Sequence, residues 1–125
     1  MRKINSKDKG KRGEQDFIAA VCKLLGRERS AGDRRNWQWT TYGGANNPDV
    51  EIRELSGFHV EVKNTKLFSF PLWVKTLLED CSPSKVPVLA YKQERKGFWC
   101  LHRLEDVENY AVTWCQALGY EVRKP

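Results

Sequence analysis

The sequence predicts an α/β domain in which helices flank a central mixed sheet. Apolar residues recur with the period of a helix in three segments, and five shorter segments between them have the alternation or apolar runs of strands. The expected order is helix, three strands, helix, two strands, helix, which is typical of a layered α/β fold. A chain of 125 residues is also long enough to enclose one hydrophobic core.

The first element is a helix that follows a basic arm. Residues 1–12 are mostly Lys, Arg, Asn, Ser and Gly, so we expect a flexible arm there and one folded domain over residues 13–125. Gly13 opens the helix and Gly26 ends it. A polar, basic connection follows at residues 27–36. The apolar residues of the helix recur at helical spacing: Phe17, Ile18, Val21, Leu24 and Leu25.

Three strands are expected after this connection. Residues 37–42 alternate aromatic with polar side chains, which is typical of a strand. The segment at residues 43–47 has the composition of a loop, and a second strand runs from Pro48 to Arg53. A turn at residues 54–57 leads into a third strand at residues 58–63, so the second and third strands form a hairpin.

The second half of the chain predicts a helix, two strands and a last helix. Ser69 is a typical N-cap residue, and Pro71 falls in the first turn of the helix that follows. The strands are expected at residues 85–92 and 97–101, and the last helix at residues 104–118. Tyr110 and Trp114 on this last helix are one possible dimer interface.

The hairpin separates an apolar face from a charged face, because side chains alternate along a strand. If Arg53 pairs with Gly57, Asp49 lies opposite Glu61, and the two Cβ atoms are roughly 4.5–5.5 Å apart. Two carboxylates this close repel each other unless a cation neutralises them, and hard divalent cations prefer oxygen ligands. The apolar face consists of Val50, Ile52, Phe58, Val60 and Val62, and the charged face of Asp49, Glu51, Arg53, His59, Glu61 and Lys63.

The charged face contains the groups that phosphodiester hydrolysis requires. A metal ion held by carboxylates polarises a phosphoryl oxygen and lowers the pKa of a bound water. A lysine on the same face, here Lys63, can orient or deprotonate that water, or stabilise charge in the transition state. The alternative is that these are ordinary surface charges of a half-exposed hairpin. Against it, Asp is disfavoured inside strands, and like charges directly opposite each other cost stability.

Pro48-Asp49, followed after eleven residues by Glu61-Val62-Lys63, resembles the PD-(D/E)XK signature of the restriction-endonuclease-like nuclease superfamily. That superfamily has a core of order αβββαβ, in which the Asp begins the second strand and the E-x-K motif lies on the third. Lys11-Arg12-Gly13-Glu14 resembles the opening of the Holliday junction resolvases of archaea and phages. In those proteins the helix Glu reaches the metal site. The resemblance covers roughly residues 5 to 101.

The resemblance implies a Mg²⁺-dependent endodeoxyribonuclease, with Mn²⁺ able to substitute, that resolves four-way DNA junctions as a homodimer. Asp49 and Glu61 would hold the metal with help from the Val62 carbonyl and Glu14, and Lys63 would position the attacking water. Two alternatives stay open. One is a restriction- or repair-type endonuclease that acts on other DNA structures, and the other is a non-catalytic DNA-binding module with the same fold.

The positive charge of the chain lies at its beginning. Residues 1–35 contain eleven Lys/Arg and five Asp/Glu, and residues 36–125 contain eleven of each, so the whole net charge of +6 belongs to the first segment. This asymmetry favours a polyanionic partner, although a solvated basic tail would look the same. We expect phosphate contacts, which weaken with salt, from Lys7, Lys9, Lys11, Arg12, Arg34, Arg35 and Lys66.

The sequence argues against a membrane protein. No stretch approaches the roughly 18 apolar residues of a membrane-spanning helix. The N-terminus is basic and polar, without the apolar core of a signal peptide. We therefore expect a cytoplasmic protein with no membrane partner, located in the cytoplasm of the host cell if a phage encodes it.

Overall fold

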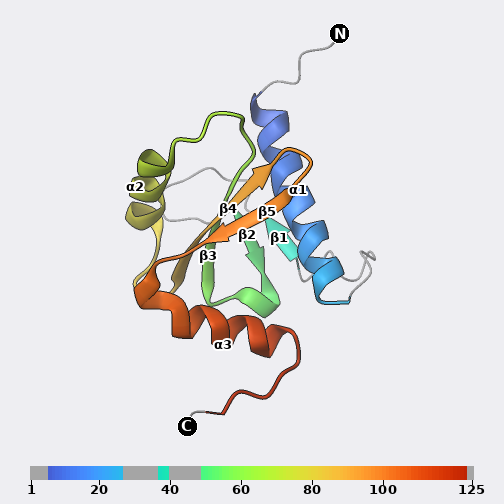
Figure 1. Cartoon of the computed structure of the whole chain (residues 1–125), viewed down its shortest axis with the longest axis vertical. Coiled ribbons are helices and arrows are strands. Elements are labelled where there is room, and N and C mark those ends of the chain that lie inside the picture. Colours follow the sequence, from blue (N-terminus) through green and yellow to red (C-terminus); the bar gives the residue numbers. More distant parts are fainter. Residues whose placement is uncertain (1–5, 27–36, 40–48, 124–125) are drawn as a thin grey trace.

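The computed structural model describes residues 6–26, 37–39 and 49–123 of the chain. Short 3₁₀ helices, η2 (Arg53–Leu55) and η3 (Leu104–Asp106), precede β3 and α3. The element order agrees with the order expected from the sequence, and the domain is of the mixed α/β class (Figure 1). The main elements are α1 (Ser6–Leu24), β1 (Trp37–Trp39), β2 (Val50–Ile52), β3 (Phe58–Lys63), α2 (Phe70–Asp80), β4 (Val86–Gln93), β5 (Gly97–Leu101) and α3 (Val107–Ala117).

The strands form one five-stranded mixed sheet in the order β1-β2-β3-β4-β5. β3 and β4 are parallel, whereas the other neighbouring pairs are antiparallel. Two parallel strands that are adjacent need a crossover connection, and α2 makes it here. β3 is therefore the middle strand, with the hairpin partner β2 on one side and β4 on the other.

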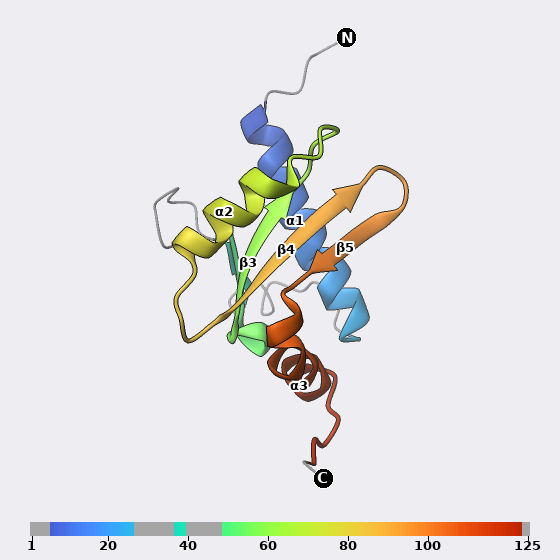
Figure 2. The same ribbon diagram turned by 60° about the vertical axis from the view of Figure 1, so that its left-hand side comes forward.

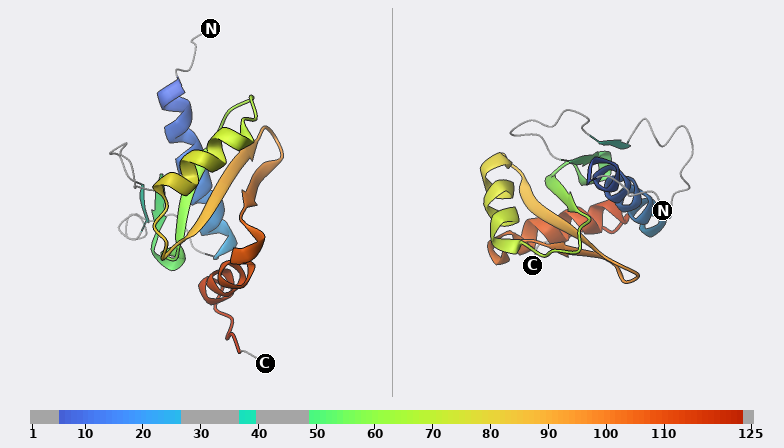
Figure 3. Two further views of the ribbon diagram at one scale, coloured as in Figure 1. Left: turned by 90° about the vertical axis from the view of Figure 1, so that its left-hand side faces the viewer. Right: turned by 90° about the horizontal axis from the view of Figure 1, so that it is seen from above.

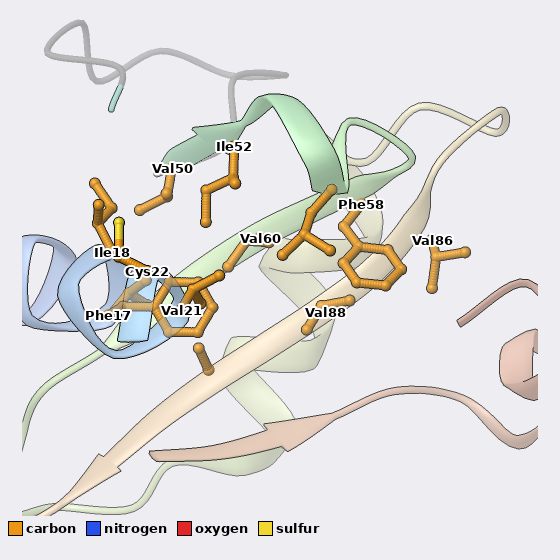
Figure 4. Packing of buried hydrophobic residues seen from close by; sticks show 13 residues of the cluster. Phe17, Ile18, Val21, Cys22, Val50, Ile52, Phe58, Val60, Val86 and Val88 are labelled. Carbon is orange, nitrogen blue, oxygen red and sulfur yellow. The ribbon is translucent and has the colours of Figure 1, made fainter. Parts of the chain in front are cut away.

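The helices cover both faces of the sheet. Figure 3 shows α1 and α2 on opposite sides of it. The larger core cluster packs α1 against β2, β3 and β4, and the apolar hairpin face predicted from the sequence lies within it (Figure 4). The side chains of this cluster that are buried are Phe17, Ile18, Val21, Cys22, Val50, Ile52, Leu55, Phe58, Val60, Val62, Val86, Val88 and Ala90.

A smaller cluster lies on the other face, under α2. Trp73 and Leu77 of α2 pack there with Leu89 of β4, and Tyr91 and Leu101 cover the edges of the contact. Strand alternation explains the division, because Val88 and Ala90 belong to the α1 face while Leu89 belongs to the α2 face. Each face of β4 is thus covered by a helix.

α3 packs within the chain and does not present its aromatic residues as a free surface. The Tyr110 ring stacks on Phe58 with 5.2 Å between ring centroids, and Trp114 lies 6.0 Å from the same ring. The suggestion that Tyr110 and Trp114 form a dimer interface is therefore not supported by their placement. Figure 2 shows α3 below the lower end of the sheet.

Several element bounds differ from the sequence expectation. α1 begins at Ser6, so residues 6–12 of the expected arm are helical, whereas residues 1–5 lie outside the described residues. Lys and Arg are good helix formers, which explains the earlier start. β2 is short because η2 begins at Arg53. No helix within the described ranges is long and apolar enough to cross a membrane.

Candidate active site

The charged face of the hairpin lies on the α2 side of the sheet and is more buried than the sequence suggested. His59 is 1% exposed and Glu61 is 5% exposed, whereas Lys63 at the end of β3 is partly exposed. α2 packs over this side of the sheet and removes His59 and Glu61 from water, whereas Glu51 and Arg53 stay exposed. An interpretation of Glu61 as an ordinary surface charge is therefore wrong.

Asp49 and Glu61 are brought together where β2 begins. Val50 pairs with Val60, and the neighbouring residues Asp49 and Glu61 lie close enough for the charge of Asp49 to raise the pKa of Glu61. The main-chain N–H of Asp49 donates to the carbonyl of Val60 at 3.0 Å. The N–H of Val62 donates to Oδ2 of Asp49 at 2.9 Å, so a side chain takes the place of the next main-chain acceptor. The predicted pairing of Arg53 with Gly57 does not extend the ladder, because Arg53 lies in η2.

Glu61 is buried and Asp49 is partly buried, and burial raises the pKa of both carboxyl groups. Burial raises the pKa of Asp49, and the Val62 N–H and the charge of Lys63 only partly oppose this. Burial and the charge of Asp49 raise the pKa of Glu61, again against the opposing effect of Lys63. A cation bound between the two carboxyl groups would stabilise their ionised forms at neutral pH.

Lys63 is held between an acid and an aromatic ring. Its Nζ lies 3.7 Å from Oε2 of Glu61 and 6.0 Å from the centroid of the Trp73 ring. Both contacts restrict the position of the amine at the end of β3. The lysine of the sequence motif is therefore located next to Glu61, as the alternation along the strand predicted.

Glu14 approaches the same cluster from α1. Burial and the charge of Asp49 raise the pKa of Glu14 from 4.5 to about 7, while Lys11 lowers it. The preceding residue, Gly13, makes this approach possible. A Cβ atom at Gly13 would lie 2.7 Å from Cβ of Asn64, directly after β3, so a larger residue could not pack here without a shift.

The donor set fits a divalent cation of the Mg²⁺ type. Within residues 6–26, 37–39 and 49–123, no three His, Cys, Asp or Glu side chains form a group that could hold a metal ion alone. Mg²⁺ does not require such a cage, because it keeps several waters and commonly binds to one or two carboxylates. Asp49 and Glu61 supply two carboxylates whose raised pKa values indicate uncompensated charge.

Sequence reasoning missed the contribution of α2. The charge of Asp80, the last residue of α2, raises the pKa of both Asp49 and Glu61. Trp73 supports Lys63 from the same helix. Nothing in the sequence placed these residues near the hairpin, because their position depends on how the crossover helix packs on the sheet. The Nε2 of His59 is buried and has no hydrogen-bond partner among the described residues.

The expected DNA contacts are partly placed. Lys11, Arg12 and Lys66 are exposed, and Lys11 lies near enough to Glu14 for its charge to act on that carboxyl group. Lys7 and Lys9 belong to α1, but the positions of their side chains lie outside what the structure describes. Arg34 and Arg35 lie outside the described residues, as does Pro48.

Asp49, Glu61 and Lys63 therefore form one cluster at the end of β3, with Glu14 close to it, and α2 covers one side. Comparisons of the chain with protein-family models, with curated proteins and with solved structures find no match.

Proposed function

We propose that this protein is a metal-dependent endonuclease that hydrolyses phosphodiester bonds in DNA. The observation that carries the proposal is the partly buried Asp49 next to the buried Glu61, with Lys63 beside them. A chain that needed these residues only for solubility would not bury two like charges against each other, because that arrangement costs stability. A catalytic metal site explains why the cost is tolerated.

The residues of the cluster have distinct roles in this proposal. Asp49 and Glu61 would hold Mg²⁺, or Mn²⁺ in its place, together with the Val62 carbonyl, and Glu14 would assist from α1 without a direct bond to the ion. When bound, such an ion stabilises charge on the phosphoryl oxygens and makes a bound water more acidic. Lys63 orients the attacking water and stabilises negative charge that develops on the phosphate. Its contacts with Glu61 and Trp73 hold the amine in place for this role.

Exposed cations near the cluster support DNA as the substrate. Lys11 and Arg12 lie on the turn of α1 that precedes Glu14, and Lys66 follows β3. In this proposal they contact phosphates on either side of the cut bond. The resemblance to junction resolvases makes a four-way DNA junction, cut by a homodimer, the first substrate to test. A restriction- or repair-type cut in another DNA structure would use the same cluster.

The test compares cleavage of a labelled four-way junction and a matched linear duplex, in Mg²⁺ and in EDTA. We expect cutting by the wild type in Mg²⁺ only. Lys63→Met should reduce the rate by at least about 100-fold, because it removes the amine and keeps the apolar stem. Lys75→Met is the matched control, since Lys75 is exposed on α2, and it should cut like the wild type.

Three outcomes decide between the candidate functions. Cutting of the junction alone supports a resolvase, and equal cutting of both substrates supports a less selective endonuclease. Tight binding without cutting by the wild type would favour a non-catalytic DNA-binding module. An unchanged rate in Lys63→Met would show that the assigned role of Lys63 is wrong.

A further inference from the structure

A row of paired residues crosses the sheet from Lys63 to its edge. Lys63 of β3 is the register partner of Tyr91 on β4, and Tyr91 is the partner of Trp99 on β5. Register partners project from the same face, and neighbouring strands lie about 4.8 Å apart. Trp99 is therefore on the order of 10 Å from Lys63, on the face that α2 covers only in part.

Phe68 joins this row from the loop between β3 and α2. Its ring meets Tyr91 edge-on at 5.1 Å between centroids and meets Trp73 edge-on at 5.2 Å. Phe70 stacks on the Phe68 ring at 5.8 Å between centroids, and 56% of Phe68 stays exposed. Phe68, Tyr91 and Trp99 are called the aromatic row below. Phe68 and Trp99 are exposed, and Tyr91 is partly buried.

Trp99 is exposed but fixed in orientation. The residue is 58% exposed. Its indole N–H nevertheless donates to Oε1 of Gln93 across the β4–β5 hairpin at 2.9 Å. A single exposed aromatic residue is ordinary on a protein surface. An exposed ring held in one orientation, in register with a catalytic lysine, loses little further side-chain freedom when a flat ligand stacks on it.

Cations flank the aromatic row at both ends. Arg95 and Lys96 are exposed in the turn of the β4–β5 hairpin and make no ion pair with any residue that the structure describes, although Glu94 shares the turn. Lys66 is exposed beside Phe68. Figure 2 shows the β3–α2 loop and the hairpin tip at the same end of the molecule. Aromatic rings between cationic side chains are the combination that binds unpaired DNA strands.

We propose that the aromatic row stacks on the exposed base faces of an unpaired DNA strand next to the bond that is cut. Such bases occur in a flap, in a gap and at the open centre of a branched junction. This inference rests on the proposed nuclease function and narrows its substrate class. A second copy of the chain is the competing occupant. The flanking cations argue against it, because a two-fold contact would bring like charges together, whereas DNA neutralises them.

The test measures binding by fluorescence anisotropy in EDTA, with a forked duplex that has a single-stranded arm and a blunt duplex of the same length. We expect the wild type to prefer the fork. Trp99→Ala should weaken binding to the fork by about 10-fold and leave binding to the blunt duplex unchanged, because base stacking is lost. Trp99→Phe should retain most of the preference. Tyr120→Ala is the control, since Tyr120 is also exposed, at 66%, but follows α3.

Other outcomes would overturn the inference. The first is a wild type that binds neither DNA, or that binds the fork and the blunt duplex equally well. The second is a Trp99→Ala variant whose affinity falls equally for both DNAs, or for neither. A wild-type dimer in sedimentation that Trp99→Ala dissociates would show that a second copy covers the rings. The cleavage assay separates this inference from the proposed function. Fork binding through Trp99 without cleavage would support the stacking role and contradict the nuclease proposal. Cleavage without a preference for the fork would support the nuclease proposal and contradict the stacking role.

Discussion

The charge of Asp49 is expected to lower the stability of the fold. Its carboxyl group is partly buried near Glu61, and the Val62 N–H and the charges of Lys63 and His59 oppose the rise in its pKa that burial causes. Groups at functional sites often oppose stability in this way, and the rest of the fold compensates. The charge of Asp49 should therefore matter for cleavage and cost stability in the absence of metal.

Asp49→Asn separates these two effects. The amide oxygen can still accept the Val62 N–H, but the negative charge is gone. We expect cleavage to fall by at least about 100-fold. The melting temperature in EDTA should rise by a few degrees, because a charge with a raised pKa is removed. Glu51→Gln, on the exposed side of β2, should change neither quantity. A lower melting temperature for Asp49→Asn would contradict this account.

For single residues, the sequence predicted positions only where side chains alternate along a strand. The period of two placed Glu61 and Lys63 on one face, and the predicted hairpin brought Asp49 near Glu61. The burial of His59 and the approach of Asp80 could not be predicted. Both depend on the packing angle of α2, which no local pattern determines.

Among the elements, α1 matters for the site because it closely approaches the end of β3. Gly13 is the point of contact, and its missing side chain leaves the room that Asn64 fills. Glu14 follows it directly, so the approach determines how near that carboxyl group comes to Asp49. A change in the helix can therefore affect the site without altering any residue of the hairpin.

Gly13→Ala and Gly10→Ala form a matched pair that tests this contact. A Cβ at Gly13 meets Asn64 at 2.7 Å, whereas one at Gly10 has nothing within 4 Å. We expect Gly13→Ala to lower the free energy of unfolding by about 1–3 kcal/mol and to reduce cleavage. Gly10→Ala should raise it by about 0.5–1 kcal/mol, because alanine favours the helix. Urea unfolding measures both, and a gain in both variants would show that the contact is loose.

The order of elements was predictable, but several bounds were not. Strands of three residues, such as β2, are too short for alternation to locate their ends. η2 replaces the expected end of that strand, because the chain turns at Arg53 in a 3₁₀ helix. The first turns of α1 were not predicted, because Lys and Arg are good helix formers but are also common in disordered basic segments.

For the molecule as a whole, the acidic cluster links stability to pH and to metal. Burial and Asp49 raise the pKa of Glu14 from 4.5 to about 7. Between these two values the folded protein holds a proton that the unfolded chain releases, so stability falls as the pH rises through this window. A bound divalent cation stabilises the ionised form and reverses the loss.

We therefore expect Mg²⁺ to raise the melting temperature more at pH 8 than at pH 5. Without metal, the melting temperature should decline between pH 4.5 and pH 7, and Glu14→Gln should make this decline shallower. Thermal unfolding monitored by tryptophan fluorescence measures both effects. An equal effect of Mg²⁺ at the two pH values would count against a metal site at these carboxylates.

The net charge of +6 predicts a second property of the whole molecule, the salt dependence of DNA binding. Affinity should fall steeply with salt, because each phosphate contact releases counterions. Lys66→Ala should reduce the slope of log affinity against log salt by about 0.9. Lys85→Ala, at the opposite end of β4 from Tyr91, is the control and should leave the slope unchanged. A salt-independent affinity would exclude phosphate contacts as the source of binding.

The parallel pairing of β3 with β4 has a consequence for how the protein folds. β2 can pair with β3 early, because a short turn joins them. β4 can align beside β3 only after the chain has closed the loop that contains α2, and closing such non-local contacts is slow. Glu61 and Lys63 lie on β3, under that helix. The cluster is therefore completed in a late folding step, and a nascent chain that ends before β4 has not yet assembled the proposed site.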